Sequence, residues 1–295
     1  MIRFGVAGWD YKDWWGSVYP LAPQRGFDPL AYLARYYDTI EINSTFYGAG
    51  SARTSINWTH RVRGHPQFRF TAKLWKRFTH DRGEPWNSDD VSQVHAALEP
   101  LAAEGRLGCV VAQFPWSFKR APENEDWLGD LIRAFFDFPL AIEVRHSSWN
   151  DSSFYAALSE QGVGIVNIDQ PVFRHSIKPG ATVTAPTGYV RLHGRNFDNW
   201  FREEAQSHER YDYLYTAEEL TGWLVRIRSI ASQARDTYVV TNNHYLGKAP
   251  ANAAMLRKLY GAVDVEVPPD LEREYHDILA PLGIRPEGAS EQLSW

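Results

Sequence analysis

Eight short apolar segments alternate with seven helix-like segments between residues 2 and 260, and this alternation constrains the fold more than any other feature. The apolar segments are short and rich in β-branched or aromatic residues, as buried strands are. They cover residues 2–8, 39–43, 67–73, 107–113, 139–145, 163–168, 188–193 and 237–243. The segments that favour helices cover residues 28–37, 51–62, 88–103, 124–136, 151–160, 216–234 and 249–260. Strands separated by helices predict parallel βαβ units, and eight such units predict a closed (β/α)8 barrel of the TIM type.

The repeat is irregular in two places. Residues 170–186 show no clear helix after the sixth strand, and residues 195–214 form a long polar and aromatic loop after the seventh. An open doubly wound sheet is the main alternative, but it usually carries a glycine-rich dinucleotide loop, and no G-x-G-x-x-G occurs in the chain. We therefore predict an α/β fold with a single barrel domain over residues 1–280, one further helix over 270–279, and a C-terminal tail over 281–295.

Composition limits the class of protein. With 295 residues and 44% hydrophobic content, the chain is long enough to bury a large core. A net charge of -5 argues against a generic basic nucleic-acid binder. The single cysteine, Cys109, excludes an intrachain disulfide and a cysteine-based zinc site. The N-terminus has no signal-peptide pattern, and no apolar run is long enough to span a bilayer, so we expect a cytoplasmic protein with no membrane partner.

Polar and charged side chains fall near the carboxyl ends of the predicted strands, which is where barrel enzymes place their active sites. Side chains alternate between the two faces of a strand, so Glu143 and Arg145 share one face while Ile142 and Val144 take the other. The residues expected on the same, inward face of their strands are Glu41, Asn43, Arg69, Thr71, Lys73, Gln113, Glu143, Arg145, Asn167, Asp169, Arg191, His193, Thr241 and Asn243. Burying an unpaired ion costs several kcal/mol, so these charges must either pair with one another or face a wet pocket.

The cations in this set favour an anionic ligand, because Arg and Lys at fixed positions suit phosphate or carboxylate. Lys248 precedes a predicted helix in the loop after the eighth strand, where barrel enzymes often hold phosphate. Trp9 and Tyr11 belong to an aromatic-rich loop that suits stacking on sugars or bases. The predicted substrate-binding residues are Lys73, Arg145, Arg191, Arg195, Glu41, Asn43, Gln113, Asn243, Trp9, Tyr11 and Lys248.

Catalytic roles follow from the same end of the barrel. Glu143 or Asp169 is the predicted general base, and His193 the predicted general acid or partner base. Together with Glu41 these residues could also supply oxygen and imidazole ligands to a divalent metal. No H-E-x-x-H or similar local signature is present, so a metal is not favoured and the cofactor stays unknown.

Several motifs resemble the domain-of-unknown-function 72 family of YecE-like barrel proteins. They are Gly5-Val-Ala-Gly-Trp-Asp-Tyr-Lys-Asp-Trp14, Glu41-Ile-Asn-Ser-Thr-Phe-Tyr47, Phe68-Arg-Phe-Thr-Ala-Lys73, Glu143-Val-Arg145, Val190-Arg-Leu-His-Gly194, Tyr213-Leu-Tyr215 and Asn242-Asn243. The resemblance implies a TIM-type barrel over residues 2 to 260 and no established activity. Similarity of such barrels to metal-dependent endonucleases and sugar-phosphate isomerases suggests nucleic-acid or phosphate chemistry, although that is an analogy of fold alone.

The sequence thus predicts a barrel that binds or processes a small phosphorylated or otherwise anionic substrate, by hydrolase or isomerase-type chemistry. Three alternatives stay open. One is a nucleic-acid-processing, endonuclease-like protein or a nucleic-acid binder, with aromatic residues stacking on bases. Another is a carbohydrate-active enzyme with Glu41 and Glu143 as its acid pair. The last is a non-catalytic binding protein whose charges pair with one another. The sequence makes no prediction of the oligomeric state.

Overall fold

A closed barrel of eight parallel strands forms the centre of the molecule. The computed structural model describes residues 1–200, 202 and 207–288. The strands are β1 Ile2–Ala7, β2 Thr39–Ile42, β3 Arg69–Lys73, β4 Leu107–Gln113, β5 Leu140–Glu143, β6 Gly164–Asp169, β7 Thr187–Leu192 and β8 Asp236–Thr241. They pair in chain order, and β1 also pairs with β8, so this sheet has no free edge. The predicted barrel is confirmed.

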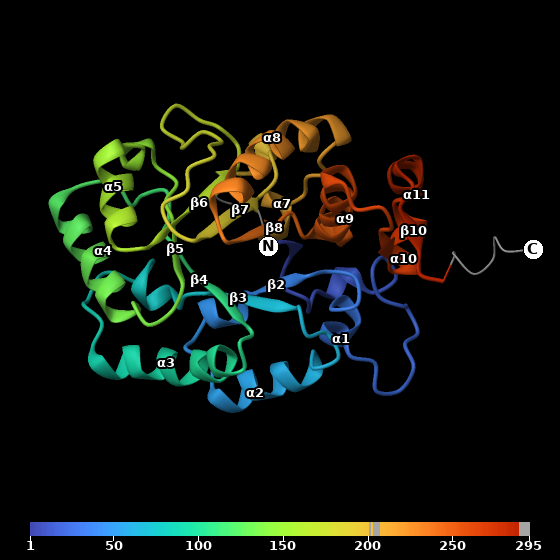
Figure 1. Ribbon diagram of the computed structural model, residues 1–295, viewed down its shortest axis with the longest axis horizontal. Coiled ribbons are helices and arrows are strands. Elements are labelled where there is room, and N and C mark those ends of the chain that lie inside the picture. Colours follow the sequence, from blue (N-terminus) through green and yellow to red (C-terminus); the bar gives the residue numbers. More distant parts are fainter. Residues whose placement is uncertain (201, 203–206, 289–295) are drawn as a thin grey trace, which may run out of the picture.

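Helices surround the barrel on its outside (Figure 1). The longer ones are α2 Ala52–Arg61, α3 Ser88–Ala103, α4 Pro122–Ala134, α5 Ser152–Glu160, α8 Ala217–Gln233 and α9 Lys248–Tyr260. The short helix α1 Pro29–Leu33 follows β1 and is capped by Asp28, whose carboxylate accepts from the amides of Leu30 and Ala31. The helix α8 begins with a capping box formed by Thr216 and Glu219. These local start signals explain why the helix starts were readable from sequence, whereas the helix expected over 28–37 ends at Leu33.

The two irregular connections have different structures. Residues 170–186, all of which the structure describes, contain no helix. The connection after β7 holds two four-residue helices, α6 Phe197–Trp200 and α7 Ser207–Arg210. The expected helix over 270–279 is split into α10 Pro269–Glu274 and α11 His276–Leu279.

The expected C-terminal tail is partly ordered. Strand β10 Arg285–Pro286 pairs with β9 Glu266–Val267, so this part of the segment 281–295 is a strand. Residues 289–295 of the segment lie outside the described residues. Of the helices that the structure describes, none combines the length and the apolar character that crossing a bilayer requires.

Single-turn 3-10 helices begin many of the loops at the C-terminal mouth of the barrel. They are η1 Lys12–Trp14 after β1, η2 Ser44–Phe46 after β2, η3 Lys76–Phe78 after β3, η4 Ser147–Trp149 after β5 and η5 Tyr245–Gly247 after β8. Leu246 in η5 has a φ of 54°, which is unusual for a branched residue. These turns fold the loops over the mouth, where they bring aromatic side chains to its rim.

The inward face of the barrel is apolar in its middle layers. Its core comprises Ala7, Cys109, Val111, Ala141, Val166, Ile168, Tyr189, Tyr238 and Val240. Residues that pair laterally in a parallel sheet share a face, and Arg191 of β7 pairs with Ile168 on one side and Val240 on the other. Ile168 and Val240 therefore point inward with Arg191, and the phase expected for β6 and β8 is reversed.

Candidate functional site

A charged network crosses the inside of the barrel near its C-terminal end. Arg191 donates from Nη1 to Glu143 Oε2 at 2.5 Å and from Nη2 to Glu41 Oε1 at 2.6 Å. Each of the three side chains is at most 1% exposed. The hydroxyl of Tyr189 donates to the other oxygen of Glu41 at 2.9 Å. The guanidinium of Arg191 on β7 thus pairs with carboxylates from β2 and β5, two strands that are not neighbours in the sheet. These ion pairs link three strands across the barrel interior.

Arg145 adds a second cation to this network. Its Nε and Nη2 lie 3.0 and 2.9 Å from Glu143 Oε1. Burial opposes ionisation of Glu143, but the charges of Arg191 and Arg145 outweigh it and hold the pKa of this carboxyl well below its ordinary range. A carboxylate stabilised in this way accepts a proton poorly, which weakens the predicted role of Glu143 as general base.

His193 is enclosed in the same network. Its Nε2 lies 3.1 Å from Glu143 Oε1, and its Nδ1 lies 3.0 Å from Nδ2 of Asn242. This pattern suits a neutral ring that donates from Nε2 and accepts at Nδ1. Burial lowers the pKa of His193 to about 3, which keeps the ring neutral at ordinary pH. Both predicted catalytic partners, Glu143 and His193, are fully buried beneath the mouth.

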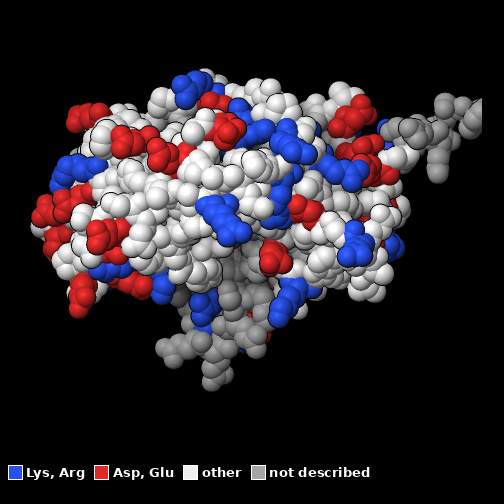
Figure 2. All heavy atoms as spheres, turned by 90° about the horizontal axis from the view of Figure 1, so that it is seen from below, with Lys and Arg blue, Asp and Glu red and all other residues white. Residues whose placement is uncertain are grey.

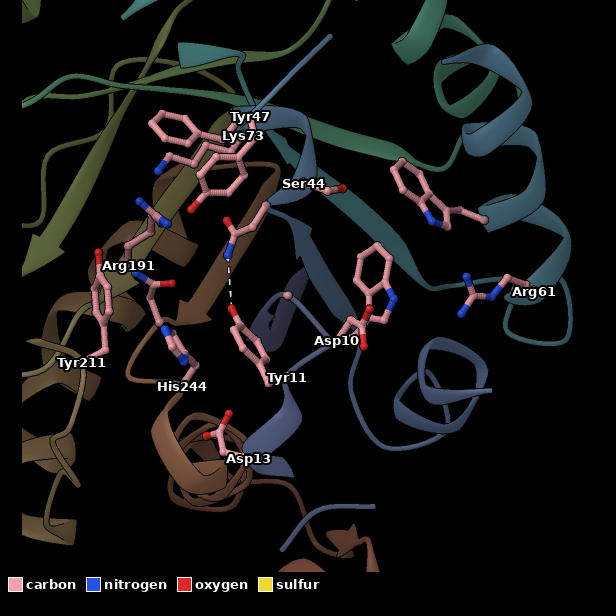
Figure 3. A pocket seen from close by; sticks show the side chains of 16 residues that line it. Asp10, Tyr11, Asp13, Ser44, Tyr47, Arg61, Lys73, Arg191, Tyr211 and His244 are labelled. Atoms are coloured by element: carbon pink, nitrogen blue, oxygen red, sulfur yellow. Dashed lines mark hydrogen bonds between the residues drawn. The ribbon is translucent and has the colours of Figure 1, made fainter. Parts of the chain in front are cut away.

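A pocket of about 720 Å³ opens above this network, between the loops after β1, β2, β7 and β8 (Figure 3). Five predicted residues, Trp9, Tyr11, Asn43, Lys73 and Arg191, are among those that line it. The other lining residues are Gly8, Asp10, Asp13, Ser44, Phe46, Tyr47, Trp58, Arg61, Tyr211, Asn242 and His244. At least half of these other lining residues lie in loops, where the alternation of a strand cannot predict the direction of a side chain.

Lys73 stands at the end of β3 with its amine in this pocket. The Nζ lies 3.7 Å from the centre of the Phe46 ring, a cation–π contact. Among residues 1–200, 202 and 207–288, no Asp or Glu oxygen lies within ion-pair distance of this nitrogen. Burial, followed by the nearby charge of Arg191, lowers the pKa of Lys73 to about 7. The Glu41 and Glu143 carboxylates oppose this shift without reversing it.

An aromatic wall faces Lys73 across the pocket. The rings of Tyr11 and His244 stack at 4.3 Å, and Tyr211 lies 5.2 Å from His244 (Figure 3). The Tyr11 hydroxyl donates to the carbonyl of Ala7 at 2.9 Å and lies 3.5 Å from the amide nitrogen of Asn43. Burial raises the pKa of Tyr11, so its hydroxyl stays protonated. The sequence analysis did not select Tyr211, His244 or Asn242 as site residues, although the motif Asn242-Asn243 lies in the same loop as His244.

Four predicted site residues lie outside the pocket and fix the connection from β7 to α8. Asp169 accepts from Nε of Arg195 at 2.8 Å, and Arg195 also reaches Glu219 at 3.1 Å. Asn243 donates to the carbonyl of Tyr213 at 2.8 Å, and Lys248 pairs with Asp212. They hold the segment that carries Tyr211 into the pocket, so the structure gives them a positioning role.

The phase reversal explains why two of these residues were expected at the mouth. Asp169 on β6 and Asn243 after β8 point to the helical side of the sheet, away from the barrel interior. Gln113 keeps its predicted inward phase in register with Glu143, but it is buried and its side chain reaches only the carbonyl of Phe114, at 3.4 Å. None of the three lines the pocket.

The four residues considered as metal ligands, Glu41, Glu143, Asp169 and His193, do not surround a common site. Glu41 and Glu143 both contact Arg191, which takes the place between them that a metal ion would need. Within the described ranges, no group of three or more His, Cys, Asp or Glu side chains is placed to hold a metal ion. Asp169 is on the opposite face of the sheet, so the four expected ligands do not converge.

Comparisons with known proteins agree with this architecture. The family described as "Protein of unknown function DUF72" matches residues 3–274. The UPF0759 protein YecE of Escherichia coli K12 is 24% identical over 252 residues, which cover 73% of this chain and 86% of YecE. A crystal structure of a DUF72 family protein from Thermotoga maritima is 32% identical with a TM-score of 0.78, covering 89% of this chain and 100% of that one. A DUF72 family protein from Enterococcus faecalis, 22% identical with a TM-score of 0.77, covers 89% and 96% and shares the fold.

Proposed function

The chain belongs to the DUF72 family, a family of unknown function, and from that premise and the geometry of its pocket we propose that it binds a small anionic ligand. The ligand carries a phosphate or a carboxylate, and Lys73 is the cation that receives this charge. The body of the ligand lies against the aromatic wall formed by Tyr11, Tyr211 and His244.

The observation that carries the proposal is the pairing state of the cations around the mouth. Arg145 and Arg191 are matched by Glu143 and Glu41 inside the barrel. At the rim, Arg61 is matched by Asp28. Lys73 alone among the cations lining or underlying the pocket has no carboxylate partner in the part of the chain that the structure describes. A half-buried ammonium without a counterion is unfavourable, so an anion that entered the pocket would gain a charge-assisted contact.

The carbohydrate-hydrolase alternative is weaker on this geometry. Such enzymes need two carboxyl groups that face the glycosidic bond from either side. Glu41 and Glu143 instead both pair with the guanidinium of Arg191 and expose no surface to the pocket. Stacking of a sugar ring on the aromatic wall remains compatible with the proposal, provided that the sugar carries an anionic group.

The nucleic-acid alternative is also weaker. Figure 2 shows Lys and Arg side chains spread over the middle of one side of the molecule, with Asp and Glu side chains among them and at its left end. A phosphate backbone favours a continuous basic surface. The net charge of -5 points in the same direction.

Calorimetric titration of the purified protein with inorganic phosphate, sugar phosphates and small dicarboxylates tests the proposal. We expect at least one of these anions to bind, and Lys73→Met to weaken its binding at least about tenfold, which is about 1.4 kcal/mol. Lys76→Met is the matched control, because Lys76 lies three residues away and pairs with Asp81. Equal affinity in the Lys73→Met protein and the wild type would contradict the proposal.

A further inference from the structure

We propose that Lys73 is a covalent attachment point, and that its amine forms an imine with an aldehyde or ketone group of the ligand in this pocket. The inference rests on the proposed function for its location and for the anionic character of the ligand. It adds a reactive group to the ligand class: an open-chain carbonyl compound that also carries a phosphate or a carboxylate.

The position of the amine supports a nucleophilic role. Lys73 ends β3, whose backbone pairs with β2 and β4, so the base of its side chain is fixed by the barrel. Its Nζ rests on the Phe46 ring, and no described acceptor ties it down. Figure 3 shows the ends of Lys73 and Arg191 extending toward the same part of the pocket. A carbonyl compound bound there would contact the amine of Lys73 beside the guanidinium of Arg191.

The other lysines of the chain lack this combination. The chain has seven lysines, and Lys12, Lys119 and Lys178 are exposed to solvent. Lys76 and Lys248 pair with carboxylates, and Lys258 donates to the carbonyl of Val263. Lys73 is therefore distinguished from its six counterparts because it is enclosed in a pocket and has no carboxylate partner among the described residues.

The electrostatics of the site support the same role. Burial lowers the pKa of Lys73 to about 7, with Arg191 and Arg145 adding to the shift and Glu41 and Glu143 opposing it. About half of the amine is then unprotonated at neutral pH, whereas an ordinary lysine with a pKa near 10.4 is less than about 0.1% unprotonated. Desolvation beside another cation is an established way to activate a lysine amine toward carbonyl groups.

The reaction balances without an oxidant or a reductant. The unprotonated Nζ adds to the carbonyl carbon, and the proton that the nitrogen then loses passes to the carbonyl oxygen, which gives a neutral carbinolamine. The hydroxyl takes up a second proton from solvent and leaves as water, and a C=N bond replaces the C=O bond. The product is a protonated imine, which keeps the positive charge at the position of the former ammonium. The anionic group of the ligand therefore stays paired after the bond forms.

Reductive trapping tests the inference on the full-length wild-type protein. The probes are glyoxylate, the smallest anionic aldehyde, and sodium cyanoborohydride, which reduces an imine to a stable carboxymethyl-lysine. Peptide mapping by mass spectrometry at limiting glyoxylate measures the rate of modification of each lysine. We expect Lys73 to react at least about tenfold faster than Lys12, Lys119 or Lys178, because its neutral fraction is about a thousandfold larger. Equal rates at these positions, or an unmodified Lys73, would overturn the inference.

Two further measurements separate this inference from the proposed function. Lys73→Arg cannot form an imine, so it should lose the rapid adduct, and calorimetry with sulfate measures separately how well the remaining cation binds the anion. If the wild type binds the anion but Lys73 is not trapped, the imine is wrong and the anion site stands. If propionaldehyde traps Lys73 as fast as glyoxylate and no anion binds or protects it, the amine is reactive and the anion site is wrong.

Discussion

Arg191 and Glu143 meet at 2.5 Å inside the barrel, where the exposed fraction of each side chain is at most 1%. The other terminal nitrogen of the same guanidinium contacts Glu41, and Arg145 contacts Glu143 from the rim. Two carboxylates are thus matched by two guanidinium groups. The network satisfies its own charges, which leaves Lys73 as the cation available to a ligand.

Removing one member of this network should destabilise the fold. Glu143→Gln leaves Arg145 without its carboxylate and Arg191 with one partner, and breaking a buried pair in this way costs about 3 to 5 kcal/mol. Urea unfolding followed by circular dichroism measures the loss. Asp130→Asn is the control, because Asp130 pairs with Arg133 on the exposed face of α4 and such pairs contribute at most about 1 kcal/mol. A Glu143→Gln protein as stable as the wild type would contradict the structural role.

Stability should also fall as the pH drops from 7 to 5, in part because of His193. The folded-state pKa of His193 is lowered to about 3, whereas the unfolded-state value is near 6.5. Between these values the unfolded chain binds a proton that the folded protein does not, so acidification favours unfolding. One such histidine removes about 2 kcal/mol between pH 7 and 5.

Urea midpoints measured across this pH range test the prediction. His193→Gln keeps a hydrogen-bonding side chain that does not titrate, so its stability should depend less steeply on pH than that of the wild type. An unchanged pH slope in the variant would assign the acid sensitivity to other groups, such as His80, whose pKa is lowered to about 4 by burial and then by Lys73.

The barrel was predictable because the evidence for it repeats. Eight strand-like segments alternate with helices that carry their own start signals, so an error in one segment does not change the topology. The inward phase of a strand was predictable only where polar and apolar residues alternate, as in Glu41-Ile42 and Glu143-Val144. In β8, the adjacent residues Val239 and Val240 are both apolar, and only the register with Arg191 decides which one points inward.

The pocket was only partly predictable for a related reason. Lys73 and Arg191 stand on strands, so their direction follows from the period of the strand. Tyr211 and His244 lie in loops, whose course depends on contacts made after the barrel has closed. Tyr211 reaches the pocket because residues distant in sequence hold its neighbours: Asn243 donates to the carbonyl of Tyr213, and Lys248 pairs with Asp212.

Asn252 should control the order of that loop. Its carboxamide accepts from the amide of Tyr215 at 3.0 Å and donates to the carbonyl of the same residue at 3.0 Å, and it also accepts from Asn243. Asn252→Ala leaves the buried backbone groups of Tyr215 unpaired, which costs about 1–3 kcal/mol per group. We expect faster amide exchange at residues 213–216 by mass spectrometry. Asn150→Ala, which removes a bond to Tyr155 at the surface, should leave the exchange of this segment unchanged.

The affinity for an anion should depend on the protonation of Lys73. Sulfate is the suitable probe because it keeps its charge of -2 over the whole range. With the pKa of Lys73 lowered to about 7, the ammonium predominates at pH 6 and the neutral amine at pH 8. The anion binds the ammonium, so affinity is present below the pKa and is lost above it. The apparent Kd for sulfate should be about tenfold higher at pH 8 than at pH 6.

Substitutions of Lys73 test whether this residue causes the pH dependence of sulfate affinity. Lys73→Arg carries a charge that does not titrate in this range, so its sulfate affinity should be the same at both pH values. Lys73→Met should bind sulfate weakly at both. His80, with its pKa lowered to about 4, stays neutral from pH 6 to 8 and contributes no slope. A wild-type affinity as flat as that of Lys73→Arg would mean that Lys73 keeps its proton through pH 8, and that the amine is not activated for reaction with a carbonyl group.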